Sequence, residues 1–256
     1  MAVSSRLGPI TGLNNSKKPD LSHLKFVQID EFYPINPLQH NSFYYFVEKF
    51  YIEGFGLNPK NSLLINSYKI PDLKDVAIEN IFPNYKIDLS LRYRDTNSDI
   101  EEKQKQTIFA IDQWCSEYEN KISDLGGIGF FLGGIGPDGH IAFNVRGSDH
   151  NSTTRILETN FETQATSASD LGGIEISRNR LVITIGLSTI TKNPDVIAII
   201  FAAGRSKAKI VKDSLQKRKD INFPATSLSD SIGSRFYLTK GAAYMLDEKN
   251  ISNKDW

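Results

Sequence analysis

Short apolar runs alternate with segments of helical periodicity along this chain. The strand-like runs are rich in Val, Ile, Leu and Phe and lie at residues 24–29, 63–65, 128–132, 181–185 and 196–201. Between them, apolar residues recur at helical spacing at 43–51, 108–122 and 204–215. Strands that alternate with helices predict an α/β fold, and nearly continuous β-branched runs are typical of strands buried on both faces of a parallel sheet. We therefore expect a Rossmann-like three-layer α/β sandwich with a mostly parallel sheet.

The pattern also predicts how the chain is divided. Residues 1–20 are polar and contain Gly8, Pro9 and Gly12, so we expect an irregular N-terminal segment there. Residues 21–256 contain no sequence repeat and no clear interdomain linker, and we expect them to form a single domain. Residues 82–100 are typical of loop and turn.

Composition and charge exclude several classes of partner. Lys and Arg number 30 and Asp and Glu number 30, so the net charge is zero and favours neither nucleic acid nor an anionic membrane surface. The single cysteine, Cys115, excludes an intrachain disulfide and a multi-cysteine zinc site. The N-terminus lacks the apolar core of a signal peptide, and no stretch approaches the ~18 apolar residues of a membrane span. We expect a cytoplasmic location.

A glycine-rich loop follows the apolar run at 128–132. Gly134, Gly136 and Gly139 formally match the G-x-G-x-x-G fingerprint of dinucleotide-binding proteins. That fingerprint requires a helix that starts within the motif, whereas residues 141–148 have little helical character. The sequence therefore disfavours a dinucleotide site.

Asp138 and His140 are separated by one glycine in the same loop. A carboxylate can orient an imidazole and stabilise its protonated form, which gives an acid–base unit near neutral pH. The alternative is an ordinary turn aspartate beside a structural histidine. A metal site that adds Asp149 and His150 is disfavoured, because these residues do not have an established ligand spacing, and we expect no metal.

Several segments together resemble one family. LGGIGPDGHIAFN at 132–144 closely resembles the signature of glucosamine-6-phosphate deaminases, and FVQIDEFYPI at 26–35 resembles a strand of that family with an acidic end. Residues 183–186 and AGRSKA at 203–208 fit the same family. The resemblance runs from about residue 20 to about residue 245. The related 6-phosphogluconolactonases share the fold and a similar GPDGH turn, but typically not the IAFN continuation or the acidic strand end.

The resemblance implies an activity and a set of site residues. The family converts glucosamine 6-phosphate and water to fructose 6-phosphate and ammonia, without a metal or a redox cofactor. It implies that Asp30 is the base that moves a proton between C2 and C1, and that His140, paired with Asp138, opens the sugar ring. Lys207 corresponds to the lysine that holds the sugar phosphate. The remaining residues assigned to substrate binding are Gly136, Gly139 and Asn144.

The chain departs from the family pattern at several positions. Val145 stands where the family usually has a glutamate that assists ring opening, and residues 163–169 contain no arginine for the phosphate. The 29 residues before Asp30 show no glycine-rich phosphate loop. Leu157 stands where some allosteric members have a lysine. We therefore expect weak phosphate binding, slow turnover, no allosteric activation, and a partly uncovered sheet that invites pairing with another chain.

Three functions consequently remain open. The first is a glucosamine-6-phosphate deaminase acting on a small amino-sugar phosphate. The second is a hydrolase of the 6-phosphogluconolactonase type, and the third is a catalytically weak sugar-phosphate-binding paralogue. The sequence leaves the oligomeric state open and allows a homo-oligomer.

Overall fold

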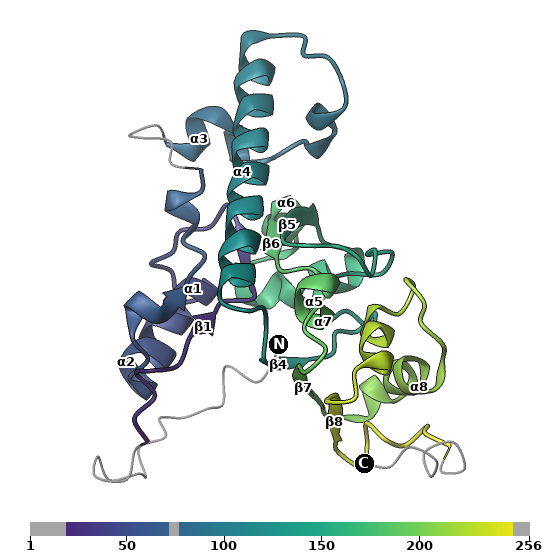
Figure 1. The fold of residues 1–256 in the computed structure, drawn as a ribbon. Coiled ribbons are helices and arrows are strands. Elements are labelled where there is room, and N and C mark those ends of the chain that lie inside the picture. Colours follow the sequence, from purple (N-terminus) through teal and green to yellow (C-terminus); the bar gives the residue numbers. More distant parts are fainter. Residues whose placement is uncertain (1–18, 72–76, 248–256) are drawn as a thin grey trace.

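The structure is a computed structural model that describes residues 19–71 and 77–247 (Figure 1). The predicted irregular segment at 1–20 therefore lies almost wholly outside the described residues. Figure 1 shows the long helix α4 at the centre, with α1 and α2 to one side of its lower end and α8 to the other. Within the described residues, no helix is long and apolar enough to cross a membrane.

The predicted helical segments at 43–51, 108–122 and 204–215 correspond to helices in the structure, whereas the helices at 161–171 and 174–179 have no predicted counterpart. The α-helices are α1 (Phe43–Phe46), α2 (Glu53–Phe55), α3 (Ile78–Ile81), α4 (Asp99–Asp124), α5 (Phe161–Leu171), α6 (Ile174–Asn179), α7 (Leu187–Thr191) and α8 (Ala208–Gln216). A π-helical stretch, Val47–Ile52, joins α1 to α2. Short 3-10 helices lie at Pro59–Asn61, Ser67–Lys69, Pro83–Tyr85, Leu89–Arg92, Arg205–Lys207 and Pro224–Asp230.

The strands form two parallel sheets and one antiparallel sheet. They are β1 (Phe26–Val27), β2 (Asp30–Tyr33), β3 (Ser62–Leu63), β4 (Phe130–Gly134), β5 (Arg155–Glu158), β6 (Leu181–Thr184), β7 (Ile197–Ala202) and β8 (Arg235–Leu238). The orders are β1-β3 and β4-β7-β8, both parallel, and β2-β6-β5, which is antiparallel. The predicted α/β fold with mostly parallel pairing is confirmed, and the antiparallel sheet is an addition to it.

Two strand predictions need correction. The run at 24–29 forms a strand only at β1, and Asp30 begins the next strand, β2, instead of following the first directly. The run at 181–185 pairs antiparallel with both neighbours. The sequence predicts a parallel strand here because β6 is buried on both faces. Such burial gives a continuous apolar run whether the strand is parallel or antiparallel to its neighbours.

Helix α4 illustrates how the sequence determines an element. Ser98 caps its start by accepting a hydrogen bond from the Glu101 N–H, and acidic side chains occupy the first turn, where they favour the helix dipole. The helix ends before Gly126, whose φ of +92° suits glycine, as the sequence predicted. Its start at Asp99 lies nine residues before the predicted apolar stripe at 108–122, because the first turns carry polar residues. The buried stripe consists of Thr107, Ile108, Ile111, Cys115, Tyr118 and Ile122.

Among residues 19–71 and 77–247, the core packs against only one face of the parallel sheet β4-β7-β8. Its inward side chains, such as Phe131 and Ile200, belong to the main core together with Val211 of α8. Its outward side chains include large apolar residues that are between 49% and 58% exposed, namely Phe130, Leu132, Ile197, Phe201 and Tyr237. The expectation that the run at 196–201 is buried on both faces is therefore wrong, since Ile197 and Phe201 are about half exposed.

Candidate active site

The carboxyl ends of β4 and β7 bring two predicted segments together. The two strands are parallel neighbours, with Gly134 opposite Phe201, so the segments that follow them leave the sheet at the same edge (Figure 1). The Lys207 ammonium donates a hydrogen bond to the Ile135 carbonyl at 2.8 Å. The loop that contains His140 and the turn that contains Lys207 thus lie against each other.

Asp138 and His140 form a direct pair. Asp138 Oδ1 lies 2.5 Å from His140 Nδ1, and both residues are buried, with exposed fractions of 1% and 9%. The second carboxylate oxygen of Asp138 accepts hydrogen bonds from the Arg146 N–H at 3.0 Å and from the Asn160 side-chain amide at 2.6 Å. The carboxylate therefore fixes the ring through Nδ1, and Nε2 has no hydrogen-bond partner among the described residues. Sequence reasoning missed Asn160, which carries no motif signal.

The charge state of Asp138 follows from these contacts. Burial alone would raise the pKa of its carboxyl. The hydrogen bond and charge of His140, together with the donors from Arg146 and Asn160, outweigh burial and hold the pKa well below its ordinary value. An ionised carboxylate is thus available to stabilise an imidazolium at His140 when that ring takes up a proton.

The predicted glycines shape the turn. A Cβ on Gly136 would lie 2.1 Å from His140 Cε1, so any other residue there would displace the imidazole. Gly139 has a φ of +88°, a conformation that favours glycine. The Gly136 N–H donates to the His140 carbonyl at 2.9 Å, and this bond closes the turn. These contacts explain both glycines without a substrate, and their predicted role in substrate binding stays a prediction.

Lys207 is half-buried beside this pair. Burial lowers the pKa of its amine, and the negative charge of Asp138 acts in the opposite direction. Lys207 immediately precedes α8, and its ammonium points back onto the loop after β4. The amine is thus positioned to meet an anionic group near His140.

Asn144 is bonded within the protein, and its predicted role in substrate binding stays a prediction. Its buried amide donates to the carbonyls of Ile141 at 3.0 Å and Ile185 at 2.9 Å, and its oxygen accepts from the Arg155 guanidinium at 2.9 Å. The hydrogen bonds of the amide are therefore made within the protein, and they connect the turn at Ile141 to the end of β6. Arg155, which the sequence did not single out for the site, also donates to the Ser148 hydroxyl at 3.0 Å.

Asp30 lies in β2, opposite Thr184 of β6. The Thr184 hydroxyl accepts a hydrogen bond from the Phe143 N–H at 3.1 Å, so β2 and the loop of His140 meet on β6. Asp30 is buried, and its Oδ2 has no hydrogen-bond partner. Burial, followed by the charge of Glu31, raises its pKa to about 8. Among the described residues, no hydrogen bond or ion pair joins the Asp30 side chain to Asp138, His140 or Lys207.

Glu31 has a structural role that its neighbour lacks. Its carboxylate accepts hydrogen bonds from the Ser42 hydroxyl at 2.7 Å and from the N–H groups of Phe43 at 3.1 Å and Tyr44 at 2.7 Å, at the start of α1. The Phe32 N–H also donates to it, at 2.9 Å. Burial nevertheless raises its pKa to about 7. Glu31 therefore holds the first turn of α1, which leaves Asp30 as the unpartnered carboxylate of the pair.

In the part of the chain that the structure describes, no carboxylate other than that of Asp138 is hydrogen-bonded to the His140 ring. Val145 makes a backbone bond to Phe143, and Asp149 accepts from the Asn151 N–H at 2.8 Å. Burial lowers the pKa of His150, whose Nε2 is buried without a partner. Within 19–71 and 77–247, no three His, Cys, Asp or Glu side chains gather as metal ligands.

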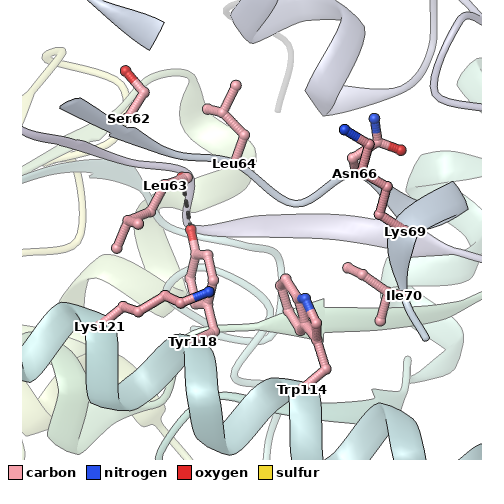
Figure 2. A pocket seen from close by; sticks show the side chains of 9 residues that line it. All are labelled: Ser62, Leu63, Leu64, Asn66, Lys69, Ile70, Trp114, Tyr118 and Lys121. Atoms are coloured by element: carbon pink, nitrogen blue, oxygen red, sulfur yellow. Dashed lines mark hydrogen bonds between the residues drawn. The ribbon is translucent and has the colours of Figure 1, made fainter. Parts of the chain in front are cut away.

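A cleft of about 250 Å³ lies elsewhere, between the segment after β3 and α4. Figure 2 shows Trp114, Tyr118 and Lys121 of α4 on one side of it, with the Tyr118 hydroxyl bonded to the Leu63 carbonyl at 2.9 Å. None of the predicted site residues lines this cleft. We therefore place the candidate active site at the β4 and β7 edge.

A histidine oriented by a carboxylate, beside a half-buried lysine and at the carboxyl edge of a parallel sheet, defines an α/β protein with an acid–base site. The fold matches that of a monomeric glucosamine-6-phosphate deaminase of the NagB superfamily with a TM-score of 0.67 and 21% identity, over 88% of this chain and 76% of that one. It also matches the 6-phosphogluconolactonase of Trypanosoma brucei with a TM-score of 0.57 and 16% identity, over 88% and 74%. At these identities the two matches establish the fold alone.

Sequence similarity points to the same family over part of the chain. A glucosamine-6-phosphate isomerase of Candida albicans is 38% identical over 120 residues, which are 47% of this chain and 48% of the relative. A glucosamine-6-phosphate deaminase of Caenorhabditis elegans is 42% identical over 94 residues, or 37% and 35%. The chain spans about half the length of the curated relatives it matches, or less. No protein-family model matches it. The resemblance to glucosamine-6-phosphate deaminases is confirmed over this portion.

Proposed function

We propose that this chain converts an amino-sugar phosphate, glucosamine 6-phosphate, and water to fructose 6-phosphate and ammonia. The observation that carries the proposal is the pairing of Asp138 with His140, which leaves His140 Nε2 without a protein partner while Lys207 lies close by. The similarity to glucosamine-6-phosphate deaminases over about half of the chain supports the choice of substrate.

The first chemical step is ring opening at His140. Its Nε2 takes the proton of the C1 hydroxyl and gives a proton to the ring oxygen as the bond between C1 and that oxygen breaks. The ionised Asp138 stabilises the imidazolium that forms between these two transfers. The open-chain sugar phosphate then has an aldehyde at C1 and an amine at C2.

The second step is proton transfer between the two carbons. Asp30 removes the proton from C2 while the protonated amine at C2 gives up a proton and the oxygen at C1 takes one up, which leaves a neutral enolamine. Asp30 then returns its proton to C1. This leaves a C=N bond at C2, to which water adds before ammonia leaves. A carboxylate with a pKa raised to about 8 is a stronger base than an exposed one, which suits removal of a proton from carbon.

Lys207 supplies the positive charge for the phosphate in this scheme. Its ammonium has three N–H donors, and the bond to the Ile135 carbonyl uses one of them, so the others can donate to phosphate oxygens. Gly136 and Gly139 would contact the substrate through backbone groups of the turn. Asn144 would then act mainly by fixing the turn, since its amide is already bonded to the protein. The scheme needs no metal and no redox cofactor, and a cytoplasmic location stays a prediction.

A lactonase of the 6-phosphogluconolactonase type is the second candidate. The structural match to such enzymes favours it, and a histidine that activates water would suffice for hydrolysis of a lactone. Such a reaction would not use Asp30. The third candidate, a sugar-phosphate-binding protein with weak catalysis, is favoured by the absence of a carboxylate at Val145.

One pair of assays distinguishes these functions. Ammonia release from glucosamine 6-phosphate and hydrolysis of 6-phosphogluconolactone are measured side by side on the purified chain, with Asp30→Asn and His140→Gln as matched variants. We expect ammonia release that both substitutions diminish. Lactone hydrolysis that survives Asp30→Asn would establish the second candidate instead. Binding of glucosamine 6-phosphate without either reaction would establish the third.

A further inference from the structure

The outward face of the sheet β4-β7-β8 is a continuous apolar surface. We call the side chains that form it the outer sheet face: Phe130, Leu132, Ile197, Ile199, Phe201 and Tyr237. They are neighbours across the strands, since Phe130 pairs with Ile197 and Phe201 pairs with Tyr237. The rings of Phe201 and Tyr237 are 5.5 Å apart. The face is therefore one patch and not a set of scattered exposed residues.

Charge is almost absent from this patch. Arg235 is the charged residue among the outward positions of these strands, and it lies on the edge strand β8, opposite Ile199. Its guanidinium donates to the carbonyls of Ile232 at 2.8 Å and Ser234 at 2.9 Å. The Arg235 guanidinium is thus bonded to its own loop, and the other outward positions of the three strands carry no charge.

An uncovered face of this kind is unusual for a parallel sheet. Parallel sheets are almost always covered on both faces, and here only the inner face packs against α8 and the rest of the core. Half-exposure of five large side chains offers on the order of 500 Å² of apolar surface, within the size of patches that mark interaction sites.

We propose that the outer sheet face is an interface between two copies of this chain. Two such faces packed against each other bury on the order of 1,000 Å² in the apolar part alone, which reaches the lower limit of a specific interface before the polar rim is added. A nearly uncharged apolar surface is self-complementary, as a two-fold contact requires. The sheets would lie about 10 Å apart, face to face. The proposal does not depend on the proposed activity.

Sedimentation equilibrium and light scattering of the full chain between about 1 and 50 µM test this interface. The expected mass is twice the 28.7 kDa of the chain. Ile197→Lys places a charge on the face, on its middle strand β7 and opposite Phe130, and should raise the dissociation constant at least tenfold. Phe109→Lys is the matched control, because Phe109 is an equally exposed apolar residue on α4, away from the face.

Further measurements keep the test decisive if Ile197→Lys folds poorly. Ile197→Ser is the milder variant, and circular dichroism reports whether each variant is folded. Binding of an apolar dye to the unaltered chain should increase on dilution, as the dimer separates and uncovers the face. A chain that is monomeric throughout, or a dimer that Ile197→Lys and Phe109→Lys weaken equally, would overturn the proposal. So would a monomer whose dye binding increases when residues 1–18 are removed, because that segment would then be the occupant.

Discussion

At the scale of single residues, burial of Asp30 has two opposite effects: it makes the carboxylate a stronger base, and it lowers the stability of the folded protein when that carboxylate ionises. Its pKa of about 8 lies far above the value of about 4 in an unfolded chain. Between pH 4 and 8 the folded protein therefore binds more protons than the unfolded one, and stability falls as pH rises through this window. An amide at position 30 keeps the shape and removes this cost, at the expense of the proposed base.

We therefore predict that Asp30→Asn lowers turnover while raising stability. Turnover should fall by about 10²–10⁴-fold, the usual contribution of a general base. The free energy of unfolding should exceed that of the unaltered protein above pH 5, with the difference growing by up to about 1.4 kcal/mol per pH unit towards pH 8. Urea denaturation at pH 5, 6.5 and 8 measures this difference. Because Glu31 is present in both proteins, its own titration largely cancels in the comparison.

Two outcomes would speak against this assignment. Near-full turnover of Asp30→Asn in an otherwise active protein would show that another group is the base. A stability difference that does not change between pH 5 and 8 would show that Asp30 is hydrated or paired in solution.

His140 is predicted to act in ring opening and not in the later steps. Replacing His140 by Gln removes the proton-accepting nitrogen and keeps a polar side chain. The loss of rate should therefore be much greater with the cyclic substrate than with an open-chain analogue that needs no opening. Parallel rate measurements on the two compounds test this. Equal losses would leave His140 as a structural residue of the turn.

At the scale of elements, the site depends on where two parallel strands end. The loop after β4 and the turn after β7 meet because their strands are neighbours, and Lys207 is held against that loop by Ile135. We predict that Lys207→Ala weakens glucosamine 6-phosphate binding at least tenfold and leaves the weak binding of unphosphorylated glucosamine unchanged. Calorimetry on both sugars measures this, with Lys192→Ala, at an exposed position, as the control. The same affinity for the phosphorylated sugar before and after the change would refute the assignment.

Much of this arrangement could be predicted from the sequence, and the exceptions have physical causes. The apolar stripe of α4, its glycine stop and the Asp138–His140 turn depend on residues close together in sequence, so local pattern was sufficient. The direction of β6 and the bonds of Asn144 to Ile185 and Arg155 depend on residues about 11 to 41 positions apart. Apolar patterning carries no information on strand direction or on such distant partners.

At the scale of the whole molecule, few of the groups that the family uses for phosphate binding and ring opening are present at the candidate site. Lys207 is the cation that the contacts bring to the site, residues 163–169 lie in α5 without an arginine, and Val145 offers no proton. A single half-solvated ion pair contributes only about 0–1 kcal/mol. The chain should therefore bind its substrate weakly.

We accordingly predict a turnover below the ordinary enzyme range of about 1–10³ per second. Steady-state ammonia release from the purified chain, followed up to high substrate concentration, measures turnover and affinity together. Because Val145 replaces a glutamate in the family pattern, Val145→Glu is the informative variant, and it should raise turnover of the cyclic substrate. A native turnover within the ordinary range would show that other residues have taken over these tasks.

The pairing of β2 with β6 has a consequence for how this protein can vary. Asp30 and Glu31 are adjacent, and a strand sends neighbouring side chains to opposite faces. Because Asp30 lies opposite Thr184, Glu31 is directed to the start of α1 and Asp30 is left without a partner. A single-residue insertion between Gln28 and Asp30 that shifts the register of β2 would turn both side chains to the opposite faces of the strand, so that neither keeps its present surroundings. The register of β2 on β6 thus determines which carboxylate can act as the base. The loops before β2 can change in sequence without affecting the base only if this register is preserved.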